Sequence, residues 1–272
     1  MFAMPEKAPL IKDDGAAVEA PLMALRVFLL RATMAFMLAA SLLSGAAFLS
    51  HVQEGNAVHA SYISALSVII TLVAAYHYRE ILKVRTYYYK DMSTKTTELV
   101  VDGLRHSDWL VTLPLLVLKL FALINNSKET VIIVDNAPLS ALFAMLMVLM
   151  GAFARLGLEG NVWMGGCNGG QNIISWLLYI GSCVILVLLL IDLGGAQSGS
   201  AQAAVVWSFF LVWPGYAVIA IGSVLVRHSW MESKYPEYMS FLKDIGYALL
   251  DLWSKAVFAW YTASLAYGVR FL

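Results

Sequence analysis

The stretch Asp251-Leu252-Trp253-Ser254-Lys255 lies inside the last long apolar segment of the chain, from about Tyr238 to Tyr267. About 20 apolar residues cross the hydrocarbon core of a bilayer, so this length is typical of a membrane-spanning helix. Charged side chains in such a helix are costly and usually face the interior of a bundle. Two interpretations are open. Either Asp251 and Lys255 form a structural ion pair on one helical face, or Lys255 is a functional amine that can form a Schiff base, with Asp251 as part of its counterion.

The composition of the whole chain is typical of an integral membrane protein. Of 272 residues, 60% are hydrophobic and 13% are charged, and the formal net charge is zero. Soluble domains have about 25% charged residues. The zero net charge gives no indication of a basic surface that binds nucleic acid. The two cysteines, Cys167 and Cys183, do not form a disulfide or metal-binding framework. No nucleophile–base set, phosphate-binding glycine loop or metal-spaced His/Cys set appears, which disfavours an enzyme.

Seven apolar segments can be counted, and each is long enough to span a membrane. They cover about residues 26–50, 60–83, 101–124, 132–156, 173–193, 203–226 and 238–267. The sequence therefore predicts an all-α membrane protein, a seven-transmembrane-helix bundle formed by residues 26–272. Residues 1–25 are polar and lack the apolar core of a cleaved signal, so we expect a retained, flexible N-terminal segment. The longest polar connection is expected between Arg79 and Gly103.

Polar residues also follow one another in the third segment, at offsets of three, four and seven: Arg105, Asp108, Thr112 and Lys119. This spacing puts them on one helical face. A bundle can bring that face against the face of the last helix. The charges of Arg105 and Asp108, together with those of Asp251 and Lys255, sum to zero, and burial favours such a neutral group. Buried charge clusters also occur in transporters and receptors, so the pattern by itself predicts a multi-pass protein that moves protons or ions.

Residues 105–116, Arg-His-Ser-Asp-Trp-Leu-Val-Thr-Leu-Pro-Leu-Leu, resemble the third helix of microbial rhodopsins. The family pattern there is Arg, two variable residues, Asp-Trp, two more residues, then Thr-x-Pro-Leu-Leu. A second signature is an aspartate four residues before a lysine in the last helix, which Asp251 and Lys255 match. The tract Ala75-Tyr76-His77-Tyr78 resembles the second helix of the proteorhodopsin branch, in which a histidine sits beside the primary proton acceptor.

The resemblance implies that all-trans retinal is bound covalently to Lys255 as a protonated Schiff base. It makes Asp108 the proton acceptor and main counterion, and Asp251 the second counterion. Arg105 would lie on the exit side and hold both carboxylates ionised.

The resemblance also assigns the surroundings of this centre. Thr112 would hydrogen-bond to Asp108, and Trp109 would form one wall of the retinal pocket. Leu116 stands where green-absorbing proteorhodopsins have leucine. His77 is either a packing residue or a hydrogen-bond partner of Asp108, and the flanking match favours the hydrogen bond.

Lys119 departs from the family, whose pumps usually carry Asp or Glu eleven positions after the acceptor. Those eleven residues correspond to about 16 Å along the helix, toward the membrane face opposite Asp108. A minor set of rhodopsins resembles this chain in using lysine as the proton donor, and a buried lysine can deliver protons. The alternative is that Lys119 snorkels to the headgroups and leaves the chain without an internal donor.

The sixth segment departs around its proline, in Phe210-Leu-Val-Trp213-Pro214-Gly-Tyr216-Ala217. The family has Trp four residues before the proline and Tyr directly before it. Phe210 and Trp213 stand there instead, and Ala217 replaces an aromatic residue, with Tyr216 next to it. These positions touch retinal or Asp251 in the family. We therefore expect an altered pocket and an Asp251 that lacks a hydrogen-bond donor.

The function expected from these residues is a light-driven proton pump, because chloride-pumping and sodium-pumping relatives do not have Asp at the acceptor position. Transport would be outward in the family orientation, with the N-terminus outside. Basic residues gather near the N-terminus and after the second helix, for example Arg26, Arg79 and Arg85, and the positive-inside rule favours the opposite orientation and inward transport. A slow-cycling photosensor is a second possibility. A non-photoactive transporter or membrane enzyme is a third.

The expected partners follow from the same resemblance. They are retinal, protons and membrane lipid, with no nucleic acid and no metal ion. Proteorhodopsin-like relatives form pentamers or hexamers, so a homo-oligomer is expected, in a multi-pass topology in the inner membrane of a bacterial cell.

Overall fold

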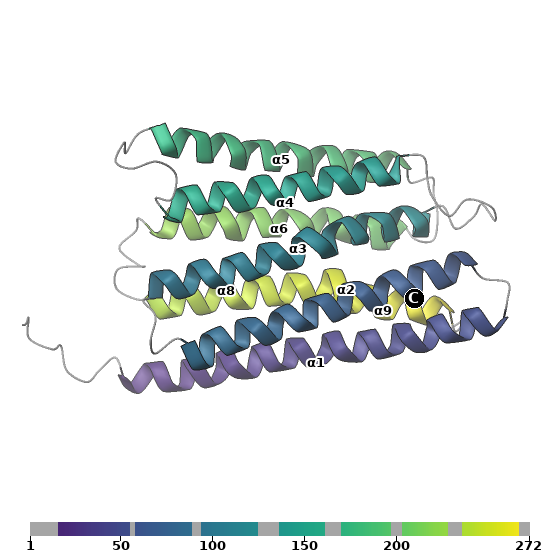
Figure 1. Ribbon diagram of the computed structural model, residues 1–272, viewed down its shortest axis with the longest axis horizontal. Helices are drawn as coiled ribbons and strands as arrows, with labels where there is room; N and C mark the ends of the chain where they lie inside the picture. The colour runs from purple at the N-terminus through teal and green to yellow at the C-terminus, as the bar shows by residue number, and fades with distance from the viewer. Residues whose placement is uncertain are drawn as a thin grey trace, which may run out of the picture.

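The computed structural model describes residues 16–54, 58–88, 94–124, 136–160, 170–196, 203–227 and 236–266. Each range carries one helical segment, and these ranges contain no strand. The helices are α1 (Ala16–Glu54), α2 (Val58–Lys83), α3 (Thr94–Ile124), α4 (Ala137–Gly160), α5 (Gly170–Ala196), α6 (Ala203–Arg227), α8 (Pro236–Asp251) and α9 (Phe258–Ala266). Figure 1 shows them lying side by side along the long axis of the molecule, with α1 and α5 on opposite sides. The expected all-α seven-helix bundle is confirmed.

Most of the described helices have the length and apolar composition of membrane spans. Five described segments are long and apolar enough to cross a bilayer: Pro21–Gln53, Ala60–Tyr87, Thr96–Ile124, Ala137–Leu158 and Ile173–Gly194. A shorter apolar stretch, Trp207–Gly222, lies on α6. The outer face of α5 exposes a row of apolar side chains at helical spacing: Ile173, Leu177, Ile180, Val184, Val187 and Ile191. Such a row belongs against lipid rather than water.

Two π-helical turns interrupt the regular helices. The turn η1 (Val84–Tyr88) ends α2, and the turn η2 (Leu252–Val257) joins α8 to α9. Turns of this kind are uncommon and occur frequently at functional sites. The second turn contains Lys255, whose side chain is buried.

Three helices extend further at one end of the bundle than the apolar segments predicted. α1 begins at Ala16 rather than near Arg26, α2 with η1 continues to Tyr88, and α3 begins at Thr94 rather than near residue 101. The prediction of a long polar connection between Arg79 and Gly103 is therefore wrong, because most of this stretch is helical. Arg85, Glu98 and Asp102 of this stretch are buried among other charges instead of lying in a solvated loop, as described below. Residues 1–15 lie outside the described residues.

Candidate functional site

The amine of Lys255 lies between two carboxylates in the middle of the bundle. Its Nζ is 2.9 Å from Oδ1 of Asp251 on the preceding turn and also donates a hydrogen bond to Oδ2 of Asp108 on α3. All three residues are at most 2% exposed. The expected meeting of the charged faces of the third and last helices is therefore present at these three residues. A buried amine in this position is both paired and held in one place.

Asp251 has two tyrosine donors. Tyr78 on α2 donates to its Oδ2 at 2.8 Å, and Tyr216 on α6 donates to its Oδ1 at 2.8 Å. Tyr216 Oη also lies 3.0 Å from Ser254 Oγ. The expectation that Asp251 lacks a donor is wrong. Tyr216 lies one helical turn after Trp213, so its hydroxyl replaces the tyrosine that the family has directly before the proline.

Replacing Tyr216 by phenylalanine should lower the free energy of unfolding by about 1.5–3 kcal/mol, because the change removes a hydrogen bond to a buried charged group. Denaturant titration of purified chain would measure this. Tyr76→Phe is the matched control, since Tyr76 is 56% exposed, and it should change stability by less than about 0.5 kcal/mol. Equal stabilities of Tyr216→Phe and Tyr76→Phe would show that the Tyr216–Asp251 hydrogen bond contributes nothing.

The Asp108 carboxylate has fewer hydrogen-bond donors than the Asp251 carboxylate. Its Oδ1 is buried and has no hydrogen-bond partner among the described residues. His77 Nδ1 is 4.0 Å from this oxygen, beyond hydrogen-bond distance, and lies 2.8 Å from the carbonyl oxygen of Val73. The expected hydrogen bond from His77 to Asp108 is therefore absent. Thr112 does bond to Asp108, but its Oγ1 donates to the backbone carbonyl at 2.9 Å.

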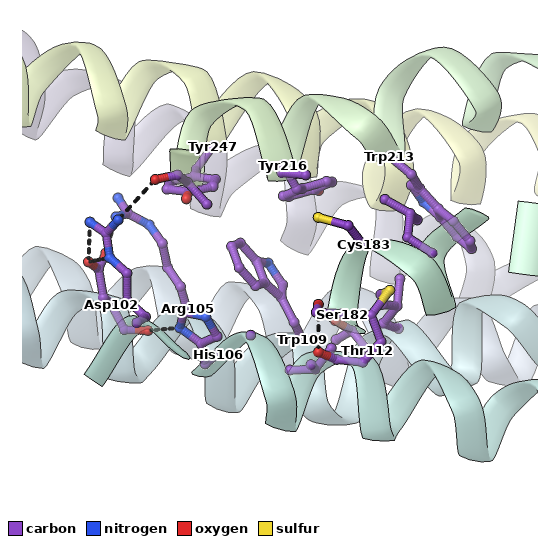
Figure 2. Close-up of a pocket in the computed structure, with 18 of the residues that line it drawn as sticks. Asp102, Arg105, His106, Trp109, Thr112, Ser182, Cys183, Trp213, Tyr216 and Tyr247 are labelled. Atoms are coloured by element: carbon purple, nitrogen blue, oxygen red, sulfur yellow. Dashed lines mark hydrogen bonds and ion pairs between the residues drawn. The ribbon is translucent and has the colours of Figure 1, made fainter. Parts of the chain in front are cut away.

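A cavity between α3, α4, α5 and α6 opens beside Lys255. Its lining includes the amine itself and the side chains of Trp109, Leu116, Met147, Leu186 and Trp213. Figure 2 shows Trp109 and Tyr216 in the middle of the cavity wall, with Asp102, Arg105 and His106 at one end. An apolar cavity that carries a buried amine on its wall fits an elongated apolar aldehyde such as retinal.

The family model for bacteriorhodopsin-like proteins matches residues 29–268. The chain belongs to the bacteriorhodopsin-like family. Members of this family bind retinal. No curated protein sequence matches the chain.

Solved microbial rhodopsins share the fold at low sequence identity. A thermophilic rhodopsin is 19% identical, with a TM-score of 0.67 over 92% of this chain and 95% of its own. A light-driven proton pump from Leptosphaeria maculans is 19% identical, with a TM-score of 0.58 over 89% and 96%. A bromide-bound halorhodopsin from Halobacterium salinarum is 17% identical, with a TM-score of 0.54 over 92% and 96%. Because these relatives are described with different ions, the shared fold does not select the transported ion.

Two of the expected pocket residues on α6 are not among those that line the cavity, namely Phe210 and Pro214. Phe210 packs toward α5, where a Cβ atom on Gly194 would lie 3.1 Å from its ring. Glycine at position 194 permits this close approach. Trp109, Leu116 and Trp213, which the resemblance assigns to the retinal pocket, line the cavity, and Thr112 lines it as well.

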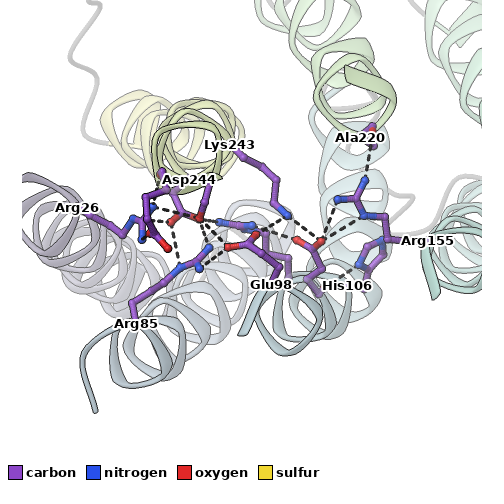
Figure 3. A network of polar contacts seen from close by, with 12 residues as sticks. Arg26, Arg85, Glu98, His106, Arg155, Ala220, Lys243 and Asp244 are labelled. Atoms are coloured by element: carbon purple, nitrogen blue, oxygen red, sulfur yellow. Dashed lines mark hydrogen bonds and ion pairs between the residues drawn. The ribbon is translucent and has the colours of Figure 1, made fainter. Parts of the chain in front are cut away.

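Arg105 does not join the Lys255 group, so the predicted four-charge cluster is wrong. Its guanidinium is 3.3 Å from Asp102 Oδ1, donates a hydrogen bond to Asp244, and lies 4.7 Å from the centre of the Tyr247 ring. In this arrangement Arg105 belongs to a second buried cluster toward the end of the bundle where α3 begins. Figure 3 shows that cluster.

The second cluster joins side chains from five helical segments. Asp244 on α8 is the centre, with Arg26 Nε at 3.3 Å and Arg85 Nε at 3.2 Å from its Oδ2. Asp102 on α3 is 3.2 Å from Arg155 NH2 and 2.8 Å from Lys243 Nζ. Glu98 also takes part through Arg85, Lys243 and Ser240. Sequence reasoning missed this cluster, although Glu98, Asp102 and Arg105 continue the helical face of Asp108 toward the start of α3.

Replacing Asp244 by asparagine should lower the free energy of unfolding by about 3 kcal/mol, because three buried arginines lose a shared countercharge. Glu80→Gln is the control. Glu80 pairs with Lys83 at 2.7 Å, both side chains are partly exposed, and such pairs contribute about 0–1 kcal/mol. Denaturant unfolding of both variants checks the difference. A loss as small as that of Glu80→Gln would show that the cluster does not hold the helix ends together.

Lys119 lies deep in an apolar region, apart from both charge clusters. It is 1% exposed, its Nζ is 4.0 Å from the centre of the Phe258 ring, and no described carboxylate lies within ion-pair distance. The side chain therefore does not snorkel to the surface in this structure. Phe258 belongs to the apolar core cluster that also contains Leu116, Leu120 and Phe121.

Proposed function

We propose that this chain is a light-driven proton pump that carries retinal on Lys255. The observation that supports this most is the position of the Lys255 amine between Asp108 and Asp251 at the wall of an apolar cavity. Retinal bound to this amine would supply the light-driven change that makes the nitrogen give up its proton. Trp109, Leu116 and Trp213 would hold the polyene and exclude water.

The hydrogen bonds around the two carboxylates support Asp108 as the acceptor. Two phenol donors stabilise the charged form of Asp251. Asp108 has one oxygen without a hydrogen-bond partner among the described residues, so less stabilisation is lost when it takes the proton. Asp251 would then remain the charged partner of the site.

Lys119 is proposed as the group that returns a proton to the Lys255 nitrogen. A buried lysine without a paired carboxylate gives up its proton more easily than a solvated one. Lys119→Met should slow this return on the order of 10²-fold. A return rate equal to wild type would remove Lys119 from the mechanism. A slow return in the wild type itself, without net transport, would favour the photosensory alternative.

The experiment that tests the function is the pH change on illumination of retinal-loaded cells, with membrane sidedness fixed by a terminal tag. Acidification of the medium, abolished by a protonophore, is expected for outward transport in the family orientation. Alkalinisation would show inward transport. A pH change that persists with the protonophore or needs chloride would contradict proton pumping.

A further inference from the structure

A buried row of hydroxyl-bearing and small side chains runs along the inner face of α2. Its members follow one another in steps of three and four residues: Ser64, Ser67, Thr71, Ala74 and Tyr78. Such steps put side chains on one face of a helix. Tyr78 donates to Asp251, so the row reaches the Lys255 group at this end.

Two other helices contribute hydroxyls to the same interior. Thr262 on α9 lies seven residues after Lys255, and its Oγ1 is 3.5 Å from Ser67 Oγ. Ser41 and Ser44 lie on the buried face of α1, which packs against α2. We call Ser41, Ser44, Ser64, Ser67, Thr71 and Thr262 the hydroxyl row. It extends from the site toward the C-terminal end of α1.

His51 lies at the far end of this row and is unpartnered. It is 6% exposed, seven residues after Ser44 on the same face of α1, and neither ring nitrogen has a hydrogen-bond partner among the described residues. Ser44 Oγ is likewise buried and unpartnered. A buried polar group without a hydrogen-bond partner is destabilising. Two such groups on one buried face indicate a place where water or a proton is taken up.

The hydroxyl row itself contains no charged side chain. Residues 58–75 of α2 and all of α9 contain no carboxylate, lysine or arginine. Their titratable side chains are Tyr62, Tyr261 and His59, and the side chain of His59 lies outside the described residues. Ser67, Thr71 and Thr262 each donate to a carbonyl one turn earlier, which leaves their lone pairs able to accept from water.

From this arrangement we infer that the hydroxyl row is a proton entry route, with His51 as the group that takes protons from the aqueous phase. The inference rests on the proposed proton transport. A proton leaves the His51 imidazolium, passes along waters, hydroxyls and Lys119, which each accept one proton and give up another, and ends on the neutral nitrogen of Lys255. A proton from the aqueous phase then restores His51. Histidine suits this task because its charge changes between about pH 5 and 8.

Flash absorption on retinal-loaded full chain in nanodiscs tests the route by timing the return of the proton to Lys255. His51→Gln should slow this return on the order of 10²-fold, and added imidazole should restore it. Ser44→Ala removes an unpartnered hydroxyl without disturbing a hydrogen bond and should slow the return less. Val52→Ala is the control, because Val52 is 55% exposed on the next position of α1, and it should behave as wild type. Equal rates in wild type and His51→Gln would overturn the inference.

A second readout needs neither retinal nor transport. In ¹⁵N-histidine-labelled, retinal-free chain, the His51 signal, assigned with His51→Gln, should respond when the bulk pH is changed. A signal that does not respond would overturn the role of His51 even in a working pump. Loss of light-driven transport in wild type, with a responsive His51 signal, would instead count against the proposed function.

Discussion

Replacing Lys255 by alanine is expected to abolish the visible absorption band that forms when retinal is added to the chain. The covalent link needs a primary amine, and Lys255 is the only lysine among the described residues that line the cavity. Absorption spectra of purified protein after retinal addition measure the effect. Lys83→Ala is the control, because Lys83 is partly exposed and pairs with Glu80, and its pigment should form as in wild type.

A folding defect must be separated from loss of the attachment site. Lys255→Ala leaves Asp108 and Asp251 as two buried carboxylates without their shared cation, which destabilises the chain. Lys255→Ala combined with Asp108→Asn removes one of those charges and should be more stable, but should also lack the band. A visible band in either variant would show that retinal is attached elsewhere.

The fold and the attachment site could be predicted from the sequence because their signals are local. Long apolar segments indicate membrane spans whatever their neighbours are. The four-residue spacing of Asp251 and Lys255, with the Arg105–Leu116 motif, was sufficient to predict that Asp108 and Lys255 lie close together.

The partners of the charged groups could not be predicted in the same way. Arg105 lies three residues from Asp108 along the chain, yet it bonds to Asp244, which is 139 residues away. Spacing shows which charges share a face, but several carboxylates compete for each arginine. Which carboxylate pairs with a given arginine depends on how far each helix is rotated in the bundle. The same holds for His77, which has the carbonyl of Val73 as a nearer partner than Asp108.

Two of the three basic residues named above for the orientation, Arg26 and Arg85, are not loop charges in the structure, whereas Arg79 is exposed. Arg26 and Arg85 are each 1% exposed and are paired with acidic side chains inside the bundle. The positive-inside rule concerns lysines and arginines in loops that flank the membrane. Buried, paired arginines are not loop charges, so they do not favour an inverted insertion. The distribution of basic residues therefore argues less strongly against the family orientation than the sequence alone indicated.

Replacing Asp108 by asparagine is expected to slow loss of the proton from the Lys255 nitrogen on the order of 10²–10⁴-fold and to stop light-driven transport. Asparagine has similar size but cannot take the proton, and Asp108 is the carboxylate with an unpartnered oxygen beside the amine. Flash absorption would follow the nitrogen, and a pH-sensitive dye would follow the released proton. The pigment itself should still form, because Lys255 and Asp251 remain paired at 2.9 Å.

Asp251→Asn separates the roles of the two carboxylates. This change removes the charge that Tyr78 and Tyr216 stabilise, so it should weaken the fold and the pigment more than Asp108→Asn does. In molecules that still bind retinal, transfer to Asp108 should persist, because the acceptor and its contact with the amine are unchanged. The opposite result, with transfer preserved in Asp108→Asn and lost in Asp251→Asn, would make Asp251 the acceptor. The two phenol donors would then set the position of the acceptor rather than hold a fixed charge.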